Sequence, residues 1–157
     1  MAFRLEVFLT KIIDENIVYK RVELDITQNS DNPDDLVILL VQKYNSGLIE
    51  KNQIISHSTS WRHVEGSTII TYIVYSDAFD FEQQETSLLP LSEIHILESG
   101  DPARPAPKAI PLNGVVSHGI RHLAFLVTNN PSVYAPVLSD NTLLRFKEID
   151  VALAGKI

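Results

Sequence analysis

The chain of 157 residues contains no cysteine. That absence excludes disulfide bonds, thiolate nucleophiles and thiolate metal ligands. Long apolar runs are also missing, because the longest, residues 36–41, is far shorter than the roughly 20 residues that span a bilayer. Basic clusters are scarce, since Lys20 and Arg21 are the only adjacent Lys/Arg pair and the net charge is −7. The sequence therefore predicts no membrane-spanning segment and no nucleic-acid-binding surface.

The motifs of common catalytic and cofactor sites are absent as well. The chain has no GxSxG elbow, no GxGxxG or Walker A loop and no EF-hand loop, so we expect no cofactor. Residues 3–7 alternate like a strand directly after Met1 and do not resemble a signal peptide. This pattern predicts a cytoplasmic protein.

What is present indicates one α+β domain over residues 1–157. Apolar residues make up 45% of the chain and charged residues 21%, which is ordinary for a globular protein. Residues 3–13 and 17–27 alternate like strands, and Asn32 and Pro33 open a helix that Gly47 closes. The remaining segments are predicted as an acidic loop (77–89), a short strand (92–99), a proline-rich surface connection (100–114) and helices (115–129, 131–138 and 140–154). We expect an antiparallel sheet of four to five strands, one inserted helix, and C-terminal helices packed on one face.

Residues 53–77 are predicted to form the central β-hairpin, with its turn at Glu65 and Gly66. Glycine readily adopts the positive φ that a two-residue hairpin turn requires. The second strand, residues 69–75, is apolar or aromatic at nearly every position, which is typical of a strand covered on both faces. With this turn, Arg62 faces Ile69, and strict alternation divides the hairpin into two faces.

The two faces of the hairpin differ in their chemistry. One carries Trp61, His57 and His63 with apolar residues of the second strand, and we assign it to the main core. Hydroxyls and a guanidinium that point the same way are suited to a carboxylate or phosphate. The reverse face has that character, because it carries Ser56, Ser58, Ser60, Arg62 and Thr71.

Two histidines indicate an alternative chemistry. His118 and His122 stand four residues apart on a predicted helix and share one of its faces, which is metal-ligand spacing. Gly119 stands where the HExxH motif of zinc hydrolases has its glutamate. A third ligand would have to come from elsewhere, and the candidates are His57, His63, His95 and Asp77.

Three segments resemble a family of small uncharacterised bacterial proteins. They are HSTSWR at 57–62, ITYIV at 70–74 and IRHLAF at 120–125, and the family shares HSTSWR, an LTY-like strand and an RHLA-like helix. The resemblance implies no activity and therefore no site residue. It adds only that Arg62, Arg121 and His122 belong together in one test.

The sequence predicts a non-enzymatic domain that binds a protein partner or a small anionic ligand, with no metal. A protein partner would dock on the acidic loop and the proline-rich segment. The alternative is a hydrolase, with or without a metal, that uses His118 and His122 with His57 or His63. The predicted ligand site consists of Ser58, Ser60, Arg62, Thr71, Arg121 and His122.

Overall fold

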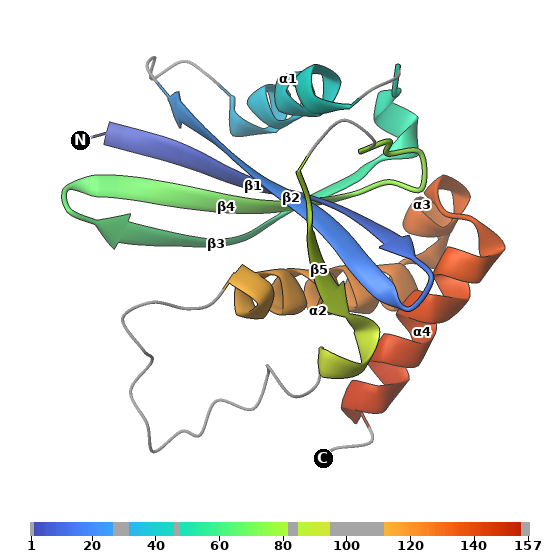
Figure 1. Cartoon of the computed structure of the whole chain (residues 1–157). Coiled ribbons are helices and arrows are strands. Elements are labelled where there is room, and N and C mark those ends of the chain that lie inside the picture. The colour runs from blue at the N-terminus through green and yellow to red at the C-terminus, as the bar shows by residue number, and fades with distance from the viewer. Residues whose placement is uncertain (1, 27–31, 46–47, 82–84, 95–111, 155–157) are drawn as a thin grey trace, which may run out of the picture.

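A computed structural model describes residues 2–26, 32–45, 48–81, 85–94 and 112–154. These residues contain a five-stranded sheet of order β3-β4-β1-β2-β5 (Figure 1). The strands are β1 (Ala2–Ile13), β2 (Asn16–Ile26), β3 (Ile55–Val64), β4 (Ser67–Tyr75) and β5 (Ser87–Pro90). The predicted mixture of helices and strands is confirmed.

The sheet is mixed, so the prediction of a purely antiparallel sheet is wrong. Strands β1 and β4 lie side by side and run parallel, whereas the other neighbouring pairs are antiparallel. It follows that β2 and β3 also run in the same direction. A connection between two such strands must cross the sheet, and the helix α1 (Pro33–Tyr44) makes this crossing. The inserted helix is therefore the reason that β4 meets β1 in parallel.

Local sequence signals explain the turns and the start of α1. The Asn32 side chain accepts a hydrogen bond from the Asp34 N–H at 2.9 Å, as expected of a residue that caps a helix. Glu65 and Gly66 have φ angles of 48° and 82°, so both central residues of the β3–β4 turn are left-handed. The predicted hairpin turn is confirmed. Gly47 lies outside the described residues, and α1 ends at Tyr44.

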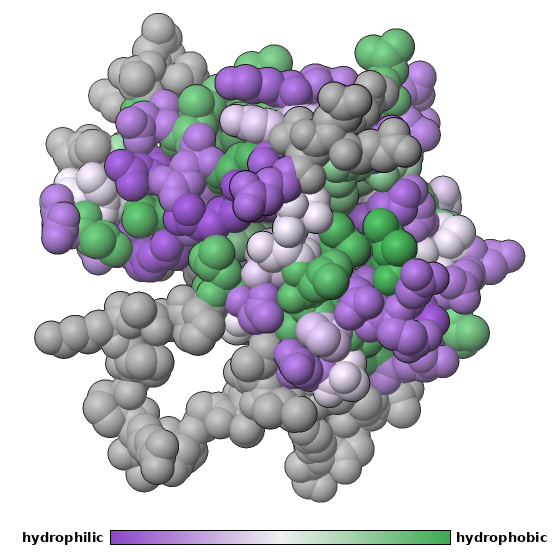
Figure 2. Space-filling model, in the orientation of Figure 1, coloured by the Kyte–Doolittle hydropathy of each residue, from purple (hydrophilic) through white to green (hydrophobic). Residues whose placement is uncertain are grey.

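Both faces of the sheet are covered by helices (Figure 1). Leu5, Val7 and Leu9 of β1 form one buried cluster with Val37, Leu40 and Val41 of α1. Phe8 of β1 belongs to a second cluster, on the opposite face, with Val116, Ile120 and Leu123 of α2 (Leu112–Asn129). Strand β4 contributes to both clusters, which confirms that it is covered on both faces. Figure 2 shows that hydrophilic residues gather at the end of the sheet where β1, β3 and β4 extend beyond α2.

The C-terminal part is helical, as predicted. Helices α3 (Pro131–Tyr134) and α4 (Asp140–Ala154) follow α2. Gly119 allows α2 to approach β4 closely, because an added Cβ would lie 3.0 Å from the Ile73 Cδ1 atom. The Phe146 ring of α4 contacts the Tyr75 ring of β4, with centroids 5.1 Å apart. None of the described helices is both long and apolar enough to cross a membrane.

Two predictions between residues 77 and 99 need correction. Strand β5 overlaps the end of the segment predicted as an acidic loop (77–89), and it pairs with β2 from Tyr19↔Ser87 to Asn16↔Pro90. Its last residue is proline, which an edge strand tolerates because one side of it needs no donor. The predicted strand 92–99 begins instead with a 3₁₀ turn, Leu91–Glu93. Residues 95–99 and most of the proline-rich segment (100–111) lie outside the described residues.

Candidate functional site

A β-bulge in β3 changes which side chains share a face. From the turn to Ser60, which pairs with Thr71, the register is the predicted one. The register then shifts, so that Ser58 pairs with Tyr72 and His57 pairs with Ile73. Thr59 is the extra residue of this bulge. The prediction was therefore wrong for Ser58, which points away from the face of Arg62, and for His57, which points toward that face.

The tryptophan assignment also needs correction. Trp61 does lie on the face opposite Arg62, but its side chain is 68% exposed and it is no core residue. It contacts the His63 ring at a centroid distance of 5.2 Å. Among the described residues β3 is an edge strand, with β4 as its single neighbour in the sheet. Within the hairpin, the buried apolar side chains of that face belong to β4, with Tyr72 and Val74.

Arg62 and Thr71 both contact one buried carboxylate. Glu6, in β1, is 1% exposed. Arg62 reaches both oxygens of Glu6 with a two-pronged contact, at 3.2 and 3.3 Å, and the Thr71 hydroxyl donates to Oε1 at 2.9 Å. Arg21 of β2 forms a further ion pair at 2.7 Å. One carboxylate thus links four neighbouring strands.

Burial and hydrogen bonding shift the pKa of Glu6 in opposite directions. Burial raises the pKa, but hydrogen bonds from Arg62, Thr71 and Arg21 outweigh burial, and the pKa is lowered overall. The carboxylate is therefore charged and neutralises the guanidinium of Arg62. Ion pairs of Arg4 with Glu23 and Asp25 extend this network of matched charges. This face already supplies an internal anion to Arg62, which leaves it poorly suited to an external one.

The bulge places His57 against α2, where it meets two further histidines. The His57 and His122 rings lie 5.6 Å apart between centroids, and the His118 and His122 rings lie 4.4 Å apart. His57 and His122 are partly buried and His118 is exposed. Arg121 is the neighbour of His122 on α2. We call His57, His118, Arg121 and His122 the basic seam, since the His57–His122 contact joins β3 to α2, the His118 ring contacts His122, and the charge of Arg121 acts on His122.

Positive charge is disfavoured in the basic seam. Burial lowers the pKa of His57. The pKa of His122 is lowered by burial first, and then by repulsion from His118, His57 and Arg121. Burial lowers the pKa of Arg121 as well. Groups that repel one another in this way gain from any anion that enters between them.

Of the candidate third ligands for the alternative metal site, the structure places His57 near the histidine pair and places His63 and Asp77 elsewhere. His57 does lie beside His122, as the histidine-based alternative requires. His63 contacts Thr68, at 2.9 Å, and Asp77 accepts from the Thr142 hydroxyl at 2.7 Å, so neither completes the seam. His95 lies outside the described residues. Within the described part of the chain, no group of three or more His, Asp or Glu side chains has the arrangement to hold a metal ion.

The six residues of the predicted ligand site therefore fall into three groups. Arg62 and Thr71 are bound to Glu6, Ser60 pairs with Thr71 across the hairpin, and Ser58 lies on the other face. Arg121 and His122 belong to the basic seam. Sequence reasoning missed Glu6, although a carboxylate two residues from Phe8, and so on the same face of a covered strand, is a signal of a paired buried charge.

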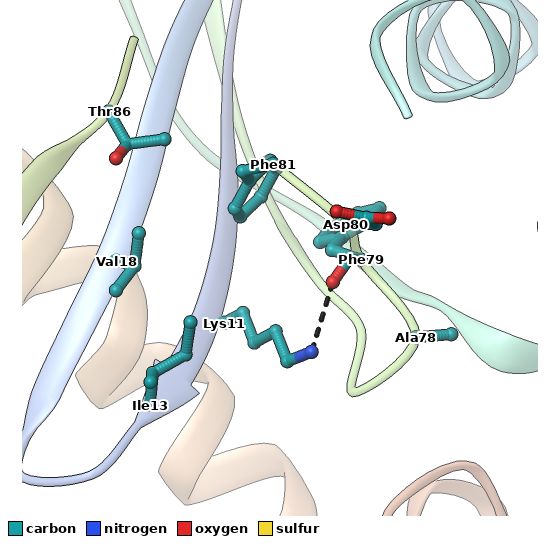
Figure 3. A pocket seen from close by; sticks show the side chains of 8 residues that line it. All are labelled: Lys11, Ile13, Val18, Ala78, Phe79, Asp80, Phe81 and Thr86. Atoms are coloured by element: carbon teal, nitrogen blue, oxygen red, sulfur yellow. Dashed lines mark hydrogen bonds between the residues drawn. The ribbon is translucent and has the colours of Figure 1, made fainter. Parts of the chain in front are cut away.

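Two surface pockets lie elsewhere. One of about 330 Å³ is lined by residues of α1, of the segment leading into β3 and of the start of β3, among them Asp34, Lys51 and Ser56. The other, of about 550 Å³, lies beside Lys11, Val18 and Phe81 (Figure 3).

Comparison with protein-family models and with curated proteins finds no match for this chain. Its function is therefore inferred from the geometry of the sites.

Proposed function

We propose that this protein is a non-enzymatic binding domain for a small, multiply charged anion such as phosphate, and that the basic seam is its site. The observation that carries the proposal is the contact of three imidazoles, two of them partly buried, with Arg121 close enough for its charge to lower the pKa of His122. This cluster stands out in a chain whose net charge is −7. The proposal keeps Arg121 and His122 from the sequence prediction and adds His57 and His118.

The seam has the groups that phosphate recognition needs. A guanidinium supplies fixed positive charge and several donors, and each neutral imidazole can donate one N–H. When phosphate binds, protonation of an imidazole adds charge to the contact and shortens its hydrogen bonds. Phosphate should therefore raise the pKa of His122 against the burial and repulsion that lower it in the free protein.

Histidine-detected NMR tests the proposal. The pKa of each seam histidine is measured with and without millimolar phosphate, and we expect phosphate to raise the pKa of His122. Arg121→Gln should abolish most of this rise. Arg145→Gln is the matched control, because Arg145 pairs with Glu15 on the surface. Unchanged histidine pKa values at saturating phosphate would rule out the seam as an anion site.

The alternative is a hydrolase that uses His118 and His122 with His57, and the 4.4 Å ring contact of the first two favours it. Turnover of a chromogenic phosphate or carboxylate ester that is lost in His118→Ala would replace the binding proposal. Elemental analysis of the same purified protein distinguishes metal-assisted from metal-free turnover.

A further inference from the structure

The larger pocket lies on the face of the sheet opposite the basic seam. Its volume is about 550 Å³, which lies within the range of small-molecule sites. Lys11 and Ile13 of β1 and Val18 of β2 line one side, and Phe79 and Phe81 from the segment after β4 line the other (Figure 3). We call it the Lys11 pocket. Five of its eight lining residues are apolar, and Lys11, Asp80 and Thr86 are polar.

The Lys11 side chain places an ammonium group in this pocket. The Lys11 ammonium donates to the Phe79 carbonyl oxygen at 3.0 Å, which anchors the side chain across the pocket (Figure 3). A lysine ammonium has three donors, so this bond leaves two of them for another acceptor. No ion pair joins Lys11 to a carboxylate of the described residues. The Asp80 side chain at the rim points away from the ammonium in Figure 3.

Further positive charge lies near the pocket on the same face. Lys20 is a diagonal neighbour of Lys11, because Lys11 pairs with Val18 and the face alternates by two residues. The Lys20 ammonium lies 5.6 Å from the centre of the Tyr44 ring, and the Lys43 ammonium lies 5.4 Å from it on the end of α1. Asp80 is the acidic residue of the lining. The lining itself holds one lysine and one aspartate, so the positive charge that favours a ligand of negative charge comes from Lys20 and Lys43 beside it.

We propose that the Lys11 pocket binds a small molecule that combines a carboxylate with a flat apolar or aromatic body. The carboxylate accepts from the free donors of Lys11, and the apolar body lies between Phe81 and the side chains of Ile13 and Val18. This ligand differs from the phosphate of the basic seam, because the pocket offers one ammonium beside the apolar side chains of Ile13, Val18 and Phe81. The two sites lie on opposite faces of the sheet and are independent of each other.

Benzoate is the probe, and benzamide is its uncharged counterpart of nearly equal shape. Titrations of the isotope-labelled protein, followed by amide shifts, should show benzoate perturbing Lys11, Val18 and Phe81. We expect benzamide to bind about tenfold more weakly or worse, because it lacks the charge that meets the ammonium. Phosphate should leave these resonances unchanged.

Lys11→Met keeps the length and apolar stem of the lysine and removes its charge. It should reduce benzoate affinity to that of benzamide, and Lys51→Met, at a lysine of the smaller pocket, should not. If Lys11→Met does not fold, the comparison of benzoate with benzamide on the unmodified protein still decides. Equal affinity for the two probes, or no shifts around the pocket at saturation, would overturn the proposal.

Discussion

Replacing Glu6 by glutamine tests the charge network that links four strands. Glutamine keeps the shape of the side chain but removes the charge that meets Arg21 and Arg62. Loss of one partner from a fully buried pair costs about 3–5 kcal/mol. Here the two arginine side chains remain 33% and 43% exposed, so their charges still reach water. We therefore expect a loss of about 2 kcal/mol in the free energy of unfolding.

Urea unfolding followed by circular dichroism measures this loss. Tryptophan fluorescence is a poor probe, because Trp61 is 68% exposed in the folded protein. Glu23→Gln is the matched control, since Glu23 pairs with Arg4 and Arg21 but its side chain is 32% exposed. The control should lose less than about 1 kcal/mol. If Glu6→Gln loses no more than the control, the network is not a source of stability.

The same variant has a predicted pH dependence. The folded pKa of Glu6 lies below its ordinary value of 4.5. The stability it contributes is therefore fully present above the unfolded pKa and is lost as the pH falls through the lower, folded pKa. Glu6→Gln should remove this part of the acid sensitivity. Parallel stability profiles of the two proteins below about pH 5 would contradict the pKa direction.

Three further predictions concern other parts of the fold. Gly119→Ala should destabilise the protein by about 1–3 kcal/mol in urea unfolding, because the new Cβ would lie 3.0–3.2 Å from Ile73 side-chain atoms. Asp77→Ala should cost about 1–3 kcal/mol and speed amide exchange in the first turn of α4, because Asp77 accepts from the Ser139 N–H at 2.8 Å and from the Thr142 hydroxyl. His122→Asn should flatten the pH dependence of stability just below about pH 6.5, since a lowered histidine pKa makes the folded protein lose stability as the pH falls through that range.

The parts of the fold that the sequence predicts well are those in which one local signal dominates. Residues 69–75 are apolar at nearly every position, and β4 is buried on both faces. Glu65 and Gly66 form the expected left-handed turn. Asn32 caps α1 as its side chain allows. In each of these three cases, the residues that carry the sequence signal are also the ones that form the structure.

The relative directions of the strands could not be predicted from local sequence signals alone. The alternating patterns of β1 and β2 and the hairpin of β3 and β4 suggested neighbours joined only by antiparallel pairing. The helix between β2 and β3 was the signal for a crossover, and a crossover makes these two strands parallel. Strand β5 was missed for a different reason. It has four residues, of which Ser87 and Leu88 are exposed, and so short a segment shows no recognisable pattern.

The bulge at Thr59 cannot be predicted from the pattern of hydrophobic residues. Ser58, Thr59 and Ser60 are similar in size and polarity, so a shift of one residue places equivalent side chains on either face, and burial does not select the register. The outer side of β3 has no neighbouring strand among the described residues to impose one. Yet this shift alone turns His57 toward α2 and brings its ring within 5.6 Å of His122. The position of Thr59 in the bulge therefore decides whether His57 belongs to the basic seam, although the side chain of Thr59 favours neither register. The register matters because α2 packs against the face toward which His57 then points.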